Sequence, residues 1–90
     1  MRAAKADANQ AEIVAALRAV GATVQHLHTV GRGCPDILVG YRDINYLLEI
    51  KTEKGKLTPP EARFFADWEG QVLIVRTIGE ALYAIGAEIV

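Results

Sequence analysis

Cysteine is nearly absent from this chain, which has one among 90 residues. A single cysteine excludes an internal disulfide and a zinc site built from cysteines. Long apolar runs are also missing, since no stretch approaches the roughly 18 residues that a membrane-spanning helix needs. The start of the chain, MRAAKADANQ, contains no apolar leader segment. We therefore expect a cytoplasmic protein with no membrane partner.

A surplus of either charge is missing as well. Ten Lys and Arg stand against eleven Asp and Glu, and the formal net charge is −1. This balance gives no electrostatic argument for nucleic acid, so any such function must follow from where particular residues lie. A chain of 90 residues has room for one domain with one core.

The spacing of apolar residues predicts the order helix, three strands, helix, strand, helix. Residues 1–8 are a polar lead-in, and residues 9–20 have the period of a helix that ends at Gly21. The predicted strands span residues 23–29, 36–41, 46–51 and 71–76. The first three can form an antiparallel meander, and the fourth must cross over through a helix. We expect a single α/β domain, residues 9–90, around a mixed central sheet.

Two predicted helices begin with the same local signal, a threonine followed three residues later by a glutamate. The two stretches are TPPE at 58–61 and TIGE at 77–80. Both are typical of a capping box, and the first also places proline at the first helical position. Such a cap stabilises a helix by about 1 kcal/mol. The helix after Thr58 carries Phe64, Phe65 and Trp68, which we expect to pack into the core.

Two acidic residues and a lysine stand at the ends of strands that otherwise look buried. Asp36 follows Pro35 at the start of one strand, and Glu49-Ile50-Lys51 closes the next. Side chains two apart on a strand share a face, so Glu49 and Lys51 point the same way while Ile50 points toward the core. A hairpin between the strands can bring Asp36 close to Glu49.

Two carboxylates in a partly desolvated pocket repel each other, which raises the pKa of at least one. A hard divalent cation such as Mg²⁺ or Mn²⁺ removes that repulsion. The lysine can hold a water and help deprotonate it, or neutralise charge on a phosphate. Metal, water and ammonium are the parts that phosphodiester hydrolysis needs. Taken singly, an acidic residue after proline is more often a turn residue, and a strand-end EIK is more often a surface ion pair.

Pro35-Asp36, a spacer of twelve residues and Glu49-Ile50-Lys51 together resemble the signature of the PD-(D/E)XK nucleases. The stretches GCPDILVG, YLLEIKTEKGKLTP and QVLIVRT are similar, more closely, to the small stand-alone VRR-NUC domains of phages and bacteria. This resemblance covers roughly residues 9 to 85. It implies a restriction-endonuclease-like α-β-β-β-α-β core with a C-terminal helix. It also implies a metal-dependent DNA endonuclease of a bacterial cell or phage-infected host.

The same resemblance implies roles for individual residues. Asp36 and Glu49 would bind Mg²⁺, for which Mn²⁺ substitutes, with help from the Ile50 carbonyl. Lys51 would serve the nucleophilic water. Glu12, on the first helix, matches an acidic residue that contacts the metal directly or through water.

The chain departs from its relatives in two places. Relatives often carry a glutamine in the helix after the lysine, where this chain reads Pro60-Glu61-Ala62. Glu61 is explained as a capping-box residue, so we expect no catalytic role for that helix. The second arginine of the "VRR" element is replaced by Thr77, which leaves Arg76 as its only candidate for a phosphate contact.

Further phosphate contacts are expected from basic residues in the loops beside the site. Arg32 lies between two glycines that let backbone approach closely, and Lys54 and Lys56 follow Lys51 in a polar loop. A solvated loop explains these residues about equally well.

Two other interpretations of the whole chain stay open: a catalytically inactive DNA-binding module on this fold, and a nuclease active only inside a larger complex. Relatives are associated with branched DNA and no base-reading element is visible, so we expect recognition of DNA structure, at junctions or flaps. We also expect a homodimer, because symmetric incision needs two metal centres. The final stretch IGEALYAIGAEIV has apolar residues on more than one helical face, as an interface would require.

Overall fold

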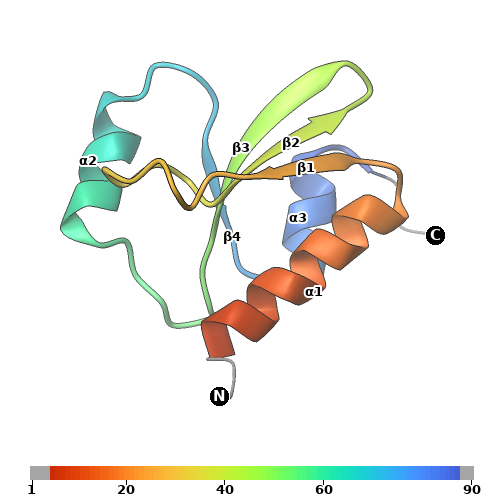
Figure 1. The fold of residues 1–90 in the computed structure, drawn as a ribbon, viewed down its shortest axis with the longest axis horizontal. Coiled ribbons are helices and arrows are strands. Elements are labelled where there is room, and N and C mark those ends of the chain that lie inside the picture. Colours follow the sequence, from red (N-terminus) through yellow and green to blue (C-terminus); the bar gives the residue numbers. More distant parts are fainter. Residues whose placement is uncertain (1–4, 88–90) are drawn as a thin grey trace.

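The computed structural model describes residues 5–87, which form three helices and four strands (Figure 1). In chain order the elements are α1 (Lys5–Ala19), β1 (Thr23–His26), β2 (Ile37–Tyr41), β3 (Ile44–Ile50), α2 (Pro59–Asp67), β4 (Leu73–Val75) and α3 (Ile78–Ala84).

The four strands form one sheet in the order β1-β2-β3-β4. β1, β2 and β3 pair antiparallel as a meander, and β4 pairs parallel to β3. A parallel neighbour requires a crossover connection, and the segment containing α2 provides it. The predicted α/β class with a mixed central sheet is therefore confirmed.

The hydrophobic core lies between the sheet and the helices α1 and α3, which contact each other (Figure 1). Ile13 and Leu17 of α1 meet Ile37 and Leu48 of the sheet, and all four side chains are fully buried. Because strand side chains alternate, Glu49 must point to the opposite face of the sheet from Leu48. That opposite face carries the candidate site.

Several element boundaries differ from the predicted ones. α1 begins at Lys5, so residues 5–8 of the expected lead-in are helical. Asn9 lies inside α1, and its side-chain N–H donates to the Lys51 and Arg76 carbonyls, so it does not cap the start of the helix. β3 begins at Ile44 because the hairpin turns over two residues only. Arg42 and Asp43 both have positive φ, 52° and 67°, as tight hairpins of this kind require.

The capping box at Thr58 is present in full. The Glu61 backbone N–H donates to the Thr58 hydroxyl, and the Thr58 backbone N–H donates to Glu61 Oε1 at 2.8 Å. The box expected at Thr77 is only half formed. Thr77 accepts from the Glu80 N–H at 3.0 Å, but Glu80 Oε1 accepts from the Arg76 backbone N–H rather than from that of Thr77.

Helix α2 lies apart from α1 and α3, at the left of Figure 1. None of its residues is buried, and Trp68 at its C-cap is 45% exposed. The expectation that Phe64, Phe65 and Trp68 pack into the core is therefore wrong: the two phenylalanines are half-buried, and none of the three belongs to the core cluster. The apolar pattern of a helix does not specify which surface it packs against. No helix within residues 5–87 is long and apolar enough to cross a membrane.

Candidate active site

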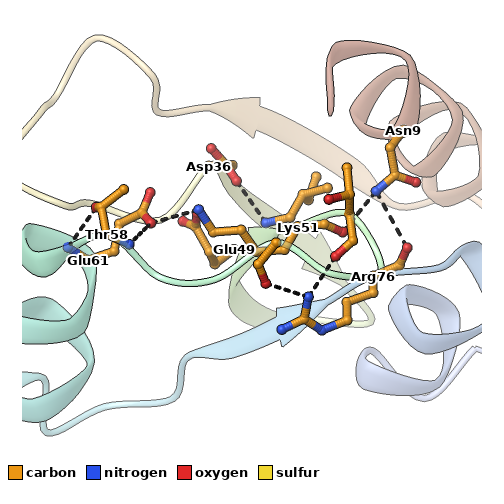
Figure 2. Close-up of polar contacts among 10 residues, drawn as sticks. Asn9, Asp36, Glu49, Lys51, Thr58, Glu61 and Arg76 are labelled. Atoms are coloured by element: carbon orange, nitrogen blue, oxygen red, sulfur yellow. Dashed lines mark hydrogen bonds and ion pairs between the residues drawn. The ribbon is translucent and has the colours of Figure 1, made fainter. Parts of the chain in front are cut away.

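The register of β2 and β3 places the two expected carboxylates opposite one another. Ile37 pairs with Leu48, so Asp36 just before β2 falls opposite Glu49. Asp36 Oδ2 accepts a hydrogen bond of 2.7 Å from the Ile50 backbone N–H, which fixes this carboxyl group against the end of β3 (Figure 2). Asp36 and Glu49, thirteen residues apart in the sequence, thus lie next to each other in the fold.

Lys51 shares a face with Glu49, as the strand period predicts. Its Nζ lies 3.4 Å from Glu49 Oε2 and 2.7 Å from Glu61 Oε1. Burial by itself would lower the pKa of Lys51, but the hydrogen bond and charge of Glu61, together with Glu49, outweigh burial and raise it. The ammonium therefore stays protonated between two carboxylates.

The environment of Glu49 opposes its ionisation. The side chain is buried, and one of its oxygens, Oε1, has no hydrogen-bond partner among residues 5–87. Burial and then the charge of Asp36 raise the pKa of Glu49 to about 8. Burial also raises the pKa of Asp36, although the Ile50 N–H opposes that rise. At neutral pH the pair favours a proton, or another positive charge, between the two carboxyl groups.

This donor set fits a hard divalent cation. When both carboxyl groups are ionised they repel each other, and the buried Glu49 Oε1 has no hydrogen-bond partner within residues 5–87, so a bound cation would relieve the repulsion; Mg²⁺ prefers such oxygen ligands. Within residues 5–87 no group of three or more His, Cys, Asp or Glu side chains is arranged to hold a metal ion. The remaining ligands would be backbone carbonyl, water or substrate oxygens, which is common for Mg²⁺.

Glu61 belongs to the site, which the sequence analysis missed. Its Oε1 accepts from both the Thr58 backbone N–H and Lys51 Nζ, so the capping residue also holds the lysine. Burial alone would raise the pKa of Glu61, but the hydrogen bonds from Lys51 and Thr58 lower it. The capping-box motif fixed the position of this carboxylate, but only the folded chain shows that Lys51 reaches it.

A network of backbone contacts holds the loop that follows Lys51 (Figure 2). One Arg76 guanidinium nitrogen, Nη1, donates to the carbonyls of Thr52, Glu53 and Gly55 at 2.6, 3.3 and 2.7 Å. Asn9 Nδ2 donates to the Lys51 carbonyl at 2.9 Å. One nitrogen of Arg76, which was predicted to contact phosphate, therefore holds the loop instead. Asn9 is a further residue of this region that the sequence analysis did not identify.

The other predicted residues lie around this centre. Glu12 is exposed on α1 and lines a hollow with Thr52, Glu53 and Arg76, so the structure does not bring it into the Asp36–Glu49 pair. Lys54 and Lys56 are exposed in the loop before α2. Arg32 is exposed beside α2, on the segment that leads to Asp36.

Neither a protein-family model nor a curated protein matches the chain. Among solved structures, one described as "VRR_NUC domain" matches with a TM-score of 0.74 and 27% sequence identity, over 88% of this chain and 91% of that one.

Proposed function

We propose that this chain, which has the fold of a VRR-NUC domain, is a Mg²⁺- or Mn²⁺-dependent endonuclease that hydrolyses phosphodiester bonds in DNA. The observation that carries the proposal is the pairing of Asp36 with buried Glu49, beside a protonated Lys51; one oxygen of Glu49 has no hydrogen-bond partner in the described part of the chain. A domain that only binds DNA has no need for this arrangement, because two desolvated carboxylates repel phosphate.

Asp36 and Glu49, with the Ile50 carbonyl, would hold the cation. A bound divalent cation supplies Lewis-acid polarisation of the phosphate and a more acidic water. Lys51 is kept protonated by Glu61 and Glu49, so it acts by donating hydrogen bonds to the attacking water or to phosphate oxygens. Because Glu12 lies outside the carboxylate pair, it would contact the cation through a bridging water.

Glu61 is a positioning residue in this proposal. Its carboxylate is itself fixed by the Thr58 cap, so it presents a rigid acceptor to Lys51 at 2.7 Å. The loop from Lys51 to Thr58 is held at its other side by Arg76 and Asn9. Lysine has a long, flexible side chain, and these contacts limit the positions it can take.

The test is cleavage of linear, flapped and four-way-junction DNA by the purified protein with Mg²⁺, with Mn²⁺ and with EDTA. Asp36→Asn should abolish cleavage. Asp43→Asn is the matched control, because Asp43 is exposed at the β2–β3 turn and asparagine tolerates its positive φ. Cleavage by Asp36→Asn within tenfold of wild type would rule out the assigned site.

We further propose that branched DNA is the preferred substrate and that Arg32, Lys54, Lys56 and the remaining nitrogens of Arg76 contact its phosphates. Arg32 lies on the segment that leads to Asp36, and the two lysines lie in the loop that follows Lys51. Contacts to the DNA backbone respond to shape rather than to sequence. We propose that the protein acts on branched DNA in the cytoplasm of a bacterial cell or phage-infected host. Preference is measured directly by the substrate panel described above.

A homodimer is the proposed active form. On α3, Ile78 and Tyr83 are 40% and 85% exposed, whereas Leu82 and Ile85 are buried in the core, and residues 88–90 lie outside the described range. Exposed apolar side chains at these two positions of α3 support a twofold contact. Light scattering at micromolar concentration should give twice the chain mass of 9.8 kDa. A monomer that cuts both strands of a junction would contradict the dimer.

A further inference from the structure

Helix α2 carries an aromatic pair on its exposed surface. The rings of Phe64 and Trp68 stack with their centroids 5.0 Å apart and an interplanar angle of 18°. Trp68 is 45% exposed, and no residue of α2 is buried. We call Phe64 and Trp68 the aromatic platform. Phe64 is half-buried, and a stacked aromatic pair with one ring exposed is typical of a binding surface.

The platform is held rigidly although it is exposed. The Trp68 indole N–H donates to the Gln71 carbonyl at 3.2 Å. The Gln71 side chain accepts from the Leu47 N–H at 2.7 Å and donates to the Leu47 carbonyl at 3.2 Å, which ties this segment to β3. Gly70 lies against the indole, where an added Cβ would stand 2.8 Å from Nε1. A ligand that stacks here finds the rings already in place and loses little conformational entropy.

A groove of about 610 Å³ runs beside the platform. Its lining comprises Val30, Gly31, Arg32, Cys34, Leu47 and the platform itself. The adjoining hollow adds Arg63 and Asp67, so two arginines stand against one carboxylate. The surface is therefore aromatic and positively charged. Proteins bind single-stranded nucleic acids with this combination, because bases stack on the aromatic rings and phosphates contact the cations.

The loop that carries Arg32 is built to lie close to α2. Arg32 has φ of 58° between two glycines that also have positive φ. A Cβ on Gly33 would overlap the Pro60 carbonyl, so only glycine lets this loop touch the start of the helix. Arg32 thereby lines both the groove beside the platform and the adjoining hollow that Arg63 lines.

The groove adjoins the proposed active site. Glu61, Phe64 and Trp68 are spaced at i, i+3 and i+7, so they follow one side of α2 over about 10 Å. Cys34, which also lines the groove, lies two residues before Asp36 in the sequence, so this side of the groove lies near the carboxylate pair. A nucleotide strand at the carboxylate pair can therefore continue along α2 to the platform.

We propose that the aromatic platform binds an unpaired nucleotide of the DNA substrate, with its base stacked on the Phe64–Trp68 pair and its phosphates contacting Arg32 and Arg63. Bases inside a duplex have no free face, so the platform distinguishes DNA with unpaired nucleotides from fully paired DNA. The position beside the active site depends on the proposed nuclease function, but the binding itself does not.

The single tryptophan of the chain makes a direct test possible, since all tryptophan fluorescence comes from the platform. Oligothymidylate is titrated into the wild-type protein in EDTA, where no cleavage occurs. Saturable quenching is expected with oligothymidylate, and much weaker quenching with a blunt duplex or with an abasic oligonucleotide of the same length. Equal quenching by the abasic strand would overturn base stacking. A fluorescence change on dilution of the protein alone, in step with dissociation of a dimer, would instead identify the platform as an interface between two copies.

Variants extend the test, with affinity measured by anisotropy of a labelled oligonucleotide. Trp68→Ala should weaken binding about fivefold or more, the lower end of a base-stacking contribution, and Ile44→Ala, which removes an exposed apolar side chain at the start of β3, should not. Arg63→Ala should reduce the salt dependence of binding, whereas Arg42→Ala, at the distant β2–β3 turn, should not. Circular dichroism checks that each variant is folded. Unchanged binding in folded Trp68→Ala would refute the proposal.

The same experiments separate this proposal from the nuclease assignment. Asp36→Asn should lose cleavage and keep quenching. If the wild type shows quenching but no cleavage, the platform proposal holds and the nuclease proposal fails. If it shows cleavage but no quenching, the nuclease proposal holds and the platform proposal fails.

Discussion

Replacing Glu49 with glutamine should remove most of the pH dependence of stability in the metal-free protein. The pKa of Glu49 is about 8 in the folded state against 4.5 for the free side chain. The folded state therefore binds more protons than the unfolded chain between these pH values, and wild-type stability falls as pH rises through that range. Glutamine resembles the protonated carboxyl group in shape and does not ionise.

The magnitude follows from the interval between 4.5 and the pH of measurement. At pH 7 that interval is about 2.5 pH units, and each unit corresponds to about 1.4 kcal/mol. The free energy of unfolding of Glu49→Gln minus that of wild type should thus increase by about 3 kcal/mol between pH 4 and pH 7. For a domain of this size this is a difference of more than about 10 °C in Tm. Asp36 remains in the variant, so a smaller dependence of the same sign should persist.

The assay is urea denaturation in EDTA, followed by circular dichroism at several pH values from 4 to 8. Glu69→Gln, which changes an exposed glutamate, is the matched control and should follow the wild type. If the difference between Glu49→Gln and wild type does not change with pH, Glu49 ionises normally in the folded state, and the reasoning from burial and repulsion fails.

Four further results are expected. Lys51→Ala should slow cleavage about a hundredfold or more and retain Mg²⁺ binding, since lysine is not a ligand, and calorimetry showing loss of both would contradict this division of roles. Mg²⁺ or Mn²⁺ at a hundredfold excess over its Kd should stabilise the protein by about 2.7 kcal/mol in thermal denaturation, and an unchanged effect in Asp36→Asn would place the ion elsewhere. Glu61→Gln should lower kcat more than it raises KM, because its carboxylate positions Lys51 rather than the substrate, and a change confined to KM would indicate substrate binding. Arg76→Ala should destabilise the fold by about 1–2 kcal/mol in urea denaturation, because three loop carbonyls lose a donor, and no change would show that the loop holds itself.

The sequence determined much of the fold and the centre of the candidate site. Strand side chains alternate with a period of two, so the letters Glu-Ile-Lys were enough to place Glu49 and Lys51 together on one face and Ile50 in the core. The Thr58 capping box fixed the start of α2, because its hydrogen bonds join residues three apart. These are local rules, and they act wherever the segment lies in the molecule.

The tertiary structure decided which groups from distant segments meet. Glu61 was already used by its own helix cap, and no local pattern shows that Lys51 also reaches it. Asn9 looked like a helix start until its amide was seen on the Lys51 carbonyl, and Arg76 looked free for phosphate until one nitrogen was seen on the loop carbonyls. The aromatic residues of α2 were expected in the core, because hydrophobic periodicity identifies an apolar face without naming the surface opposite it. Hydrogen bonds and packing between segments depend on distances through space, and these distances exist only once the chain has folded.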